Sequence, residues 1–497
     1  NCTNTGYVQG RKDVGGIVGQ MEPFLEIQYL SDKLKELDTE TDKFLDMLDA
    51  TQKDVSNYSR QASALSKSIS TNLKDANSAG NSLTGTTNDL WYIYNQELNG
   101  VSNDLKVLNN DLNKQAEDDK NNGGTASGST VSPGGEYRAV WISYLELGGM
   151  LTGKTAGQFR SNIAAAYDNA KNLGCNTVIV HVRPFGDALY RSDYYPTSYL
   201  ITGSEGDPLP FDPLKIMLEE AHNRGLTFEA WLNPYRVRPR TGKPLCSTNP
   251  AQQYINSGSD TVYQTANGGI FYNPGSREAI DLIVNGVREI VRNYDVDAIH
   301  FDDYFYASTD SSIDSALYAA NGGGKSLAAW RRQNVNTMVR EVYAAVKAEK
   351  PSVRFGISPQ GNTRINYDTL YADVATWLAN PGYVDYICPQ IYYGFQNATC
   401  PYSSVLKEFS GMIKVSGIDL YVGLAAYKIG NEDTYAGAAG KYEWQQNSDL
   451  LSRMVTEARG ADHYKGFCLY SYSSVSAPAA GVQSQVQAEL SALSKIL

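Results

Sequence analysis

Two adjacent carboxylates follow an apolar segment near the middle of the chain. Residues 296–301 are mostly apolar, Asp302 and Asp303 come next, and Tyr304 and Tyr306 follow them. A pair of carboxyl groups can divide acid–base work, because one can hold a proton while the other stays ionised. Hydrolysis of a glycosidic bond uses such a pair, ~5 to 5.5 Å apart for retention and ~6.5 to 9.5 Å apart for inversion. Asp302 is therefore our candidate nucleophile or base.

The sequence leaves the partner of Asp302 open. Asp303 is nearest in the chain, but adjacent residues on an extended strand point to opposite faces unless the backbone bends. Glu229 lies on a different apolar segment, and we assign it to catalysis together with the two aspartates. Three further carboxylates are alternatives: Asp187, Glu146 and Asp385.

The segments that carry these residues alternate between strand-like and helical patterns. The strand-like segments are 137–145, 176–185, 226–235, 296–306, 353–360, 384–393, 419–429 and 466–475. The amphipathic stretches between them include 157–173, 213–224, 276–293, 326–349, 447–459 and 482–496. Eight β/α units predict an α/β fold, a (β/α)8 TIM barrel over residues 136–497. A doubly wound sheet is the alternative, but no Gly-rich phosphate-binding turn follows the first strand.

In a TIM barrel the active site lies at the carboxyl ends of the strands. Because residues two apart on a strand share a face, the second, third and fourth strands present one set of side chains to the barrel interior. That set is His181, Arg183, Glu229, Trp231, Asn233, His300, Asp302 and Tyr304. For Glu229 and His300 a buried structural network is the plainer interpretation, since buried charge is tolerated when it is paired.

Tyrosines and amides gather at the ends of the predicted strands, and the chain has 35 tyrosines. A flat ring with a polar tip can stack on a sugar ring and still bond its hydroxyls, which favours a poly- or oligosaccharide ligand. Tyrosine also fills half-buried sheet positions, which is the plainer alternative. We assign to substrate binding His181, Arg183, Trp231, Asn233, Tyr235, His300, Tyr304, Tyr306, Gln360, Gln390, Tyr392 and Tyr427.

Composition narrows the classes of partner. The net charge of −11 and the pI near 5.0 disfavour nucleic acid and anionic membranes, and no apolar run reaches the ~18 to 20 residues that span a bilayer. Four histidines without an H-E-x-x-H motif predict no zinc site, and two aspartates are too few for Ca²⁺. We expect no metal and no cofactor. Cys246 and Cys400 fall in predicted loops and could pair.

The first part of the chain has a different composition from the predicted barrel. Residues 1–21 are rich in glycine and resemble part of a GLUG repeat of bacterial surface proteins, with a disordered tail as the alternative. Residues 22–117 repeat apolar residues with heptad spacing, which predicts an α-helical coiled coil or hairpin and allows self-association through its apolar seam. Residues 118–135 predict a flexible Gly/Ser/Thr linker. The chain starts at Asn1, so we expect a processed product or an excised piece.

Five segments in this order resemble the bacterial glycosyl hydrolase-like ten family: VIVHVRPFGDALYRSDYYP, FEAWLNPYRV, DAIHFDDYFY, FGISPQGN and DYICPQIYYGF. The resemblance runs from about Glu136 to the end of the chain. It implies a TIM barrel that is secreted or attached to the bacterial surface. It also implies a glycan substrate, since one branch of the family cleaves peptidoglycan strands stripped of their stem peptides.

A more distant similarity bears on the proton donor. Chitinase-type barrels carry D-x-x-D-x-D-x-E on the fourth strand, and that register here holds Asp297, His300, Asp302 and Tyr304. A tyrosine therefore stands where those enzymes have their acid glutamate, which disfavours their mechanism. Amylase-like barrels place a nucleophilic aspartate two residues after a basic residue, which resembles His300 and Asp302.

Three functions are compatible with these features. We favour a secreted glycoside hydrolase acting on a bacterial cell-wall glycan or a related polysaccharide. The alternatives are a surface carbohydrate-binding protein with little or no catalysis and a structural protein assembled through its helices.

Overall fold

The computed structural model describes residues 135–497. The predictions for the glycine-rich segment, the helical segment and nearly all of the linker fall on residues 1–134, outside the described residues. They stay predictions.

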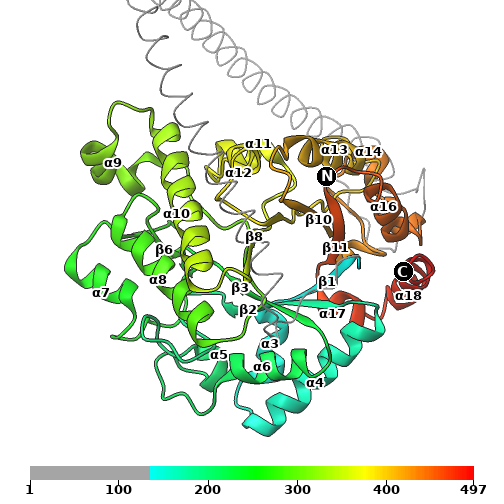
Figure 1. The fold of residues 1–497 in the computed structure, drawn as a ribbon, viewed down its shortest axis with the longest axis horizontal. Coiled ribbons are helices and arrows are strands. Elements are labelled where there is room, and N and C mark those ends of the chain that lie inside the picture. Colours follow the sequence, from blue (N-terminus) through cyan, green and yellow to red (C-terminus); the bar gives the residue numbers. More distant parts are fainter. Residues whose placement is uncertain (1–134) are drawn as a thin grey trace, which may run out of the picture. The chain divides into compact units, whose positions relative to one another are not determined.

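Eight parallel strands close into a barrel in the order β1-β11-β10-β9-β8-β7-β3-β2 (Figure 1). The strands are β1 (Tyr137–Ile142), β2 (Thr177–Arg183), β3 (Thr227–Leu232), β7 (Ala298–Phe301), β8 (Arg354–Ile357), β9 (Tyr386–Ile387), β10 (Asp419–Leu424) and β11 (Tyr464–Leu469). The closed parallel barrel confirms the predicted TIM fold, and closure excludes the doubly wound sheet.

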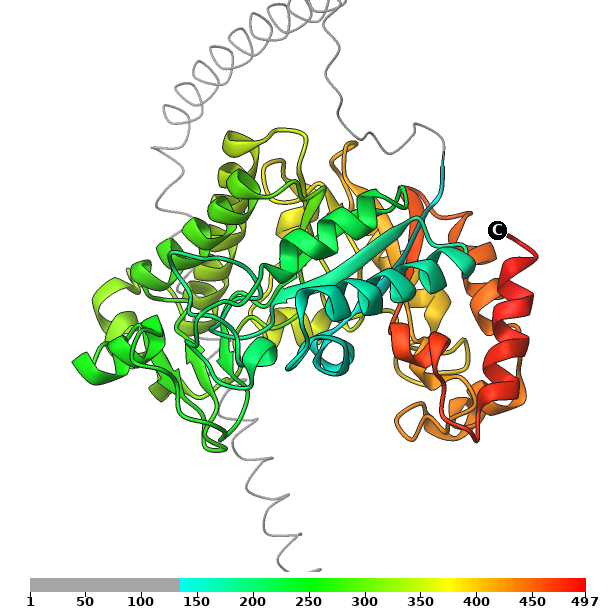
Figure 2. The same cartoon turned by 90° about the horizontal axis from the view of Figure 1, so that it is seen from below.

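Helices surround the barrel on its outer side (Figures 1 and 2). The main ones are α4 (Ala156–Asn172), α6 (Pro213–His222), α8 (Arg277–Asn293), α10 (Leu327–Glu349), α13 (Tyr402–Met412), α16 (Leu450–Ala458) and α18 (Gln483–Ser494). The sequence analysis missed α13, together with the short α12 (Val374–Ala379). The N-cap of α13 is Pro401, which makes no side-chain hydrogen bond, so the usual polar start signal is absent.

Four of the predicted helices, α4, α6, α8 and α10, begin where polar side chains cap them. Thr155 and Gln158 form a capping box at α4, and Ser276 accepts a hydrogen bond from the backbone N–H of Ala279 at the start of α8. In α16 the N-cap residue makes no such bond. Instead the buried carboxylate of Glu489, on α18, accepts hydrogen bonds from the backbone N–H groups of Leu450 and Leu451 at 2.9 and 3.1 Å. This contact joins the last helix to α16.

Polar residues at the strand beginnings tie neighbouring strands together. Asn176 accepts a hydrogen bond from the backbone N–H of Arg138 at 3.0 Å. Asp297 and Asp385 accept equivalent bonds from the N–H groups of Phe228 and Phe355, each at 2.7 Å. Asp385 also pairs with Lys347 at 2.7 Å. Asp385 therefore lies at the end of the barrel away from the carboxyl termini of the strands, and the structure contradicts it as a proton donor.

The barrel interior is packed with alternating large and small side chains, as expected for a barrel of this size. Its buried cluster consists of Tyr137, Ala139, Trp141, Ile179, Trp231, Ala298, Tyr386, Cys388, Tyr421 and Cys468. Gly356 makes room for the ring of Tyr386, because a Cβ at that position would overlap the ring. No disulfide joins Cys246 and Cys400, so the pairing considered from the sequence is not formed.

A small antiparallel sheet follows β3 and was not predicted from the sequence. It consists of β4 (Arg236–Arg238), β5 (Val262–Gln264) and β6 (Ile270–Tyr272), with β6 in the middle. The strands are each three residues long, too short for an alternation to be visible in the sequence. This insertion brings Arg236 close to the mouth of the barrel.

Residues 135–497 contain neither a membrane-spanning helix nor a cluster of metal ligands. No helix in that part is long and apolar enough to cross a membrane. No group of three or more His, Cys, Asp or Glu side chains there could hold a metal ion.

Candidate active site

Asp302 and Asp303 both lie at the mouth of the barrel, just beyond the end of β7 at Phe301. Because the strand has already ended, the rule that adjacent residues point to opposite faces no longer applies to them. Asp302 is 3% exposed, and Asp303 is partly exposed. Both residues therefore lie at the same end of the barrel, and the contacts of Asp303 give its direction.

Two side-chain amides hold Asp303. Gln360 Nε2 donates to Oδ2 at 2.8 Å, and Gln390 Nε2 donates to Oδ1 at 3.1 Å. Gln390 also donates to the carbonyl oxygen of Ser358 at 3.0 Å, which fixes its orientation. Burial raises the pKa of Asp303, and the two amide donors oppose that shift because they stabilise the ionised form.

Asp302 has a different environment. Burial, and secondarily the charge of Asp303, raise its pKa to about 8, while Arg236 acts in the opposite direction. The backbone N–H of Tyr304 donates to Oδ1 of Asp302 at 3.4 Å. The indole N–H of Trp231 lowers this pKa slightly but does not reach hydrogen-bond geometry. Asp302 therefore holds its proton more tightly than an ordinary aspartate, while two amide donors stabilise the ionised form of Asp303, which favours the roles opposite to those first suggested by the sequence.

Arg236, which the sequence analysis did not select, lies beside the pair. It is 4% exposed, and its Nε donates to the carbonyl oxygen of Pro184 at 3.0 Å. Its guanidinium carbon lies 4.4 Å from the ring centroid of Tyr304 and 5.1 Å from that of Phe185. The sequence does hold one indication of Arg236, because this residue comes directly after the polar end of the third strand.

Deeper in the barrel, Glu229 and His300 form the structural network that was the plainer expectation. Tyr386 donates its hydroxyl proton to Glu229 Oε2 at 2.6 Å, and the same hydroxyl lies 3.0 Å from His300 Nδ1. Trp141 Nε1 donates to His300 Nε2 at 3.2 Å. Glu229 pairs in register with Ala298, four residues before Asp302, which corresponds to roughly 13 Å along the strand. The structure therefore places Glu229 and His300 in a network below the mouth and not beside the carboxyl pair.

His181, Trp231 and Asn233 form the layer beneath the mouth. His181 Nδ1 accepts a hydrogen bond from the backbone N–H of Tyr144 at 3.2 Å, so Nε2 carries the proton that faces Asn233 Oδ1 at 3.2 Å. The rings of His181 and Trp231 stack with centroids 3.3 Å apart, and burial holds the pKa of His181 well below its usual value. These three side chains are almost fully buried, so they support the site from below.

The structure does not bring three of the predicted substrate-binding residues to the mouth of the barrel. The β2–β3 register shifts between His181 and Arg183, and the buried guanidinium of Arg183 packs 4.5 Å from the ring centroid of Tyr195. Tyr235 is fully buried in the outer hydrophobic core. Tyr306 is 1% exposed and packs on Arg331. The alternation rule failed here because the strands had bulged or ended.

Exposed aromatic rings do occur at the mouth, as predicted for Tyr304 and Tyr427. Tyr304 is 46% exposed and Tyr427 is 41% exposed. Tyr392 and Tyr470 stack with centroids 5.6 Å apart, and Tyr427 meets both edge-on. The charge of Asp302 contributes to the raised pKa of Tyr470, so this cluster adjoins the carboxyl pair. Tyr470 is a second residue that the sequence analysis did not select.

The remaining alternative carboxylates have structural partners. Glu146 caps α3 (Tyr144–Leu151) and accepts hydrogen bonds from Ser471 and Ser473 at 2.7 and 2.8 Å. Asp187 is buried and accepts a hydrogen bond from the backbone N–H of Tyr199 at 3.2 Å. Neither contacts Asp302 or Asp303.

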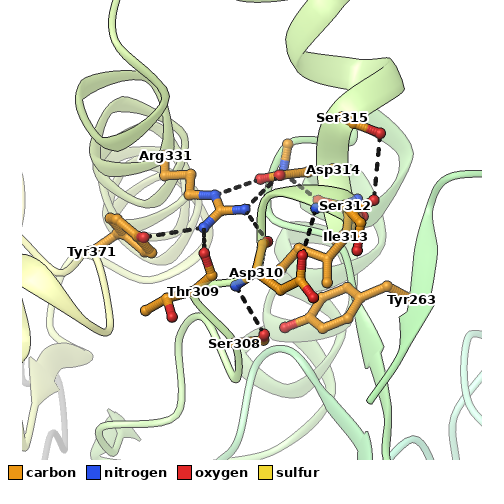
Figure 3. A network of polar contacts seen from close by, with 12 residues as sticks. Tyr263, Ser308, Thr309, Asp310, Ser312, Ile313, Asp314, Ser315, Arg331 and Tyr371 are labelled. Carbon is orange, nitrogen blue, oxygen red and sulfur yellow. Dashed lines mark hydrogen bonds and ion pairs between the residues drawn. The ribbon is translucent and has the colours of Figure 1, made fainter. Parts of the chain in front are cut away.

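A buried ion pair fixes the segment that follows the two aspartates (Figure 3). Arg331, on α10, pairs with Asp314 at 2.6 Å, and both side chains are fully buried. It also donates to the carbonyl oxygens of Thr309 and Asp310 at 3.1 and 2.6 Å, and to the hydroxyl of Tyr371 at 3.0 Å. Arg331 therefore anchors the loop between β7 and α10 to the outer helical layer.

Comparison with known proteins was made for sequence and for structure. The model of the Glycosyl hydrolase-like 10 family matches residues 136–437. The chain is 34% identical over 379 residues to glycosyl hydrolase YngK of Bacillus subtilis (strain 168), covering 71% of this chain and 72% of YngK. It is 38% identical over 287 residues to glycosyl hydrolase DigH of Escherichia coli (strain K12), covering 53% of this chain and 65% of DigH.

Among solved structures, the PgaB (BpsB) glycoside hydrolase domain from Bordetella bronchiseptica is similar, with 14% identity and a TM-score of 0.45 over 71% of this chain and 99% of that one. The family model and the two named relatives support a glycosidase. The model covers more than half of the sequence, and the chain therefore belongs to the Glycosyl hydrolase-like 10 family.

Proposed function

We propose that this protein is a secreted or surface-attached glycosidase that cleaves a bacterial cell-wall glycan, with the glycan strand of peptidoglycan as its substrate. The observation that carries the proposal is the carboxyl pair at the barrel mouth, in which Asp303 accepts hydrogen bonds from the amides of Gln360 and Gln390 while burial raises the pKa of Asp302 to about 8. Family membership supports glycosidic cleavage, and the exposed rings of Tyr304 and Tyr427 are suited to contact with sugar faces.

In this mechanism Asp302 gives its proton to the departing glycosidic oxygen as the bond to the anomeric carbon breaks. Asp303 supplies the negative charge on the other side of the reaction. It either attacks the anomeric carbon or takes a proton from the attacking water. Gln360 and Gln390 orient Asp303 and stabilise its ionised form.

The alternative is a surface protein that binds a glycan without cleaving it. The aromatic residues at the mouth would serve that function equally well. The different surroundings of Asp302 and Asp303 favour the enzyme, because binding alone does not require two neighbouring carboxyl groups held in different environments.

The test is digestion of defined glycans by the purified protein. Peptidoglycan strands freed of their stem peptides, chitin oligomers and a neutral β-glucan are incubated with it, and products are identified by mass spectrometry. Fragments from the peptidoglycan strands support the proposal. Binding to the strands without any fragments favours the alternative, and fragments from the β-glucan alone reject the proposed substrate.

A further inference from the structure

Arg236 carries a positive charge at the barrel mouth that no group in the described part of the protein neutralises by direct contact. Its side chain is enclosed by aromatic rings, with its guanidinium carbon 4.4, 5.1 and 5.6 Å from the ring centroids of Tyr304, Phe185 and Tyr144. The bond from Nε to Pro184 fixes the direction of the guanidinium. Its two terminal nitrogens form no hydrogen bond or ion pair with residues 135–497, and they are not among the fully enclosed unpaired atoms.

A second cation near this rim, Lys428, already has an anionic partner. Lys428 Nζ pairs with Asp433 at 2.6 Å and donates to the carbonyl oxygen of Tyr392 at 2.8 Å. Lys428 therefore holds a loop together. Arg236 has no such structural partner at its terminal nitrogens.

The nearest carboxyl groups, Asp302 and Asp303, form no ion pair with Arg236, so its guanidinium can bind an anionic ligand. Asp302 is largely protonated near pH 7, since burial and Asp303 raise its pKa to about 8. The two oxygens of Asp303 accept hydrogen bonds from Gln360 and Gln390. A desolvated guanidinium without an anionic contact is costly, so a substrate that brings an anion to this position would be bound preferentially.

We propose that Arg236 selects an acidic glycan by binding a carboxylate substituent of the sugar next to the cleaved bond. The proposal rests on the proposed function and adds the residue that distinguishes acidic from neutral strands. A carboxylate suits the site because a guanidinium offers two parallel N–H donors to its two oxygens. The net charge of −11 repels anionic polymers in general, so a local cation is needed if such a strand is to reach the carboxyl pair.

The test compares two substrates that differ in charge alone. Peptidoglycan strands without stem peptides carry a carboxylate on alternate sugars, and carbodiimide coupling with methylamine converts these to neutral amides on the same backbone. For the wild-type protein we expect kcat/KM to fall about 10- to 100-fold on the amidated strands, the range for loss of a charge-assisted hydrogen bond.

Three variants identify the residue responsible. Arg236→Gln should lower kcat/KM on the native strands to the level of the amidated ones, and Arg236→Lys should recover part of the discrimination. Arg238→Gln is the matched control, because Arg238 lies on the same short strand and donates to the carbonyl oxygen of Lys243 at 2.8 Å, away from the mouth. It should discriminate as the wild type does. A pH profile of Arg236→Gln separates an effect on substrate binding from an effect on the pKa of Asp302. An effect on Asp302 would change kcat/KM equally for both substrates.

The outcomes distinguish this inference from the proposed function. If the wild type cleaves both substrates equally, or Arg236→Gln still discriminates, the role of Arg236 is wrong while the glycosidase remains. The same conclusion follows if sulfated or phosphorylated strands replace carboxylated ones as the preferred substrate. If no glycan is cleaved by any variant, the proposed function itself fails.

Discussion

The side-chain amide of Gln360 donates a hydrogen bond to Oδ2 of Asp303 at 2.8 Å, across the mouth of the barrel. The two residues come from neighbouring strands, since β7 ends before Asp303 and β8 ends before Gln360. This bond stabilises the ionised form of Asp303. Together with the bond from Gln390, it assigns Asp303 the carboxylate role and leaves the proton with Asp302.

Loss of this amide should change how activity depends on pH. Gln360→Leu removes a donor to the carboxylate, so the pKa of Asp303 should rise and the acidic limb of kcat/KM should move up by about one pH unit. Gln333→Leu, at an exposed position on α10, is the control. An unchanged acidic limb in Gln360→Leu would show that Asp303 is not the group that must be ionised.

The basic limb should report Asp302. Its pKa is raised to about 8, so kcat/KM should decline as the pH rises through about 8 and the proton donor is lost. Arg236 opposes the raised value, so Arg236→Gln should move this limb to higher pH. A profile measured on a single glycan gives both values, and activity that stays constant up to pH 10 would contradict the assignment of Asp302 as the acid.

The same raised pKa should make Asp302 a destabilising residue at neutral pH. The folded protein binds the Asp302 proton more tightly than the unfolded chain does, so its contribution to stability is full below pH 4 and declines as the pH rises toward 8. Asp302→Asn removes this dependence. We expect its Tm to exceed that of the wild type by an amount that grows between pH 4 and pH 8.

The exposed variant Asp260→Asn serves as the control for this measurement. A difference in Tm that is the same at pH 4 and pH 8 would mean that Asp302 ionises normally in the folded protein.

The ion pair of Arg331 with Asp314 should contribute strongly to stability (Figure 3). Arg331→Met leaves a buried carboxylate without its partner and should lower the free energy of unfolding by about 3 to 5 kcal/mol. Arg332→Met is the neighbouring control, and it should cost less than about 1 kcal/mol because Arg332 lies over the exposed ring of Tyr367. The measurement is the midpoint of urea unfolding, compared between variants whose transitions have the same slope.

A second variant checks the origin of that effect. Arg331→Met combined with Asp314→Leu should be more stable than Arg331→Met alone, because no unpaired charge remains. Equal stabilities of Arg331→Met and Arg332→Met would contradict the account.

The barrel could be predicted because apolar residues recur with different periods in its strands and in its helices. The number of alternating β/α units then indicates the topology. The sequence also predicted that Asp302, Asp303, Gln360 and Gln390 lie at one mouth, since the ends of parallel strands meet there. The structure does not bring Arg183, Tyr235 and Tyr306 to the mouth, because they follow a register shift or the end of a strand, where alternation no longer determines direction.

Other features depend on tertiary contacts that no local pattern records. Arg236 reaches the site through three short strands, each too short to be recognised by its alternation. The depth of Glu229 in the barrel follows from its pairing with Ala298 on the neighbouring strand. The sequence alone does not show which residues of two strands pair. The helical prediction for residues 22–117 lies outside the described residues and stays a prediction.

The most direct test of the central claim is the turnover of peptidoglycan strands without stem peptides by Asp303→Asn and Asp302→Asn, with Asp260→Asn as the control. The account predicts that each site variant retains its fold and binds the strands, while its kcat falls by about 10² to 10⁴ relative to the control. A kcat of either site variant within a few-fold of the control would contradict catalysis by this pair.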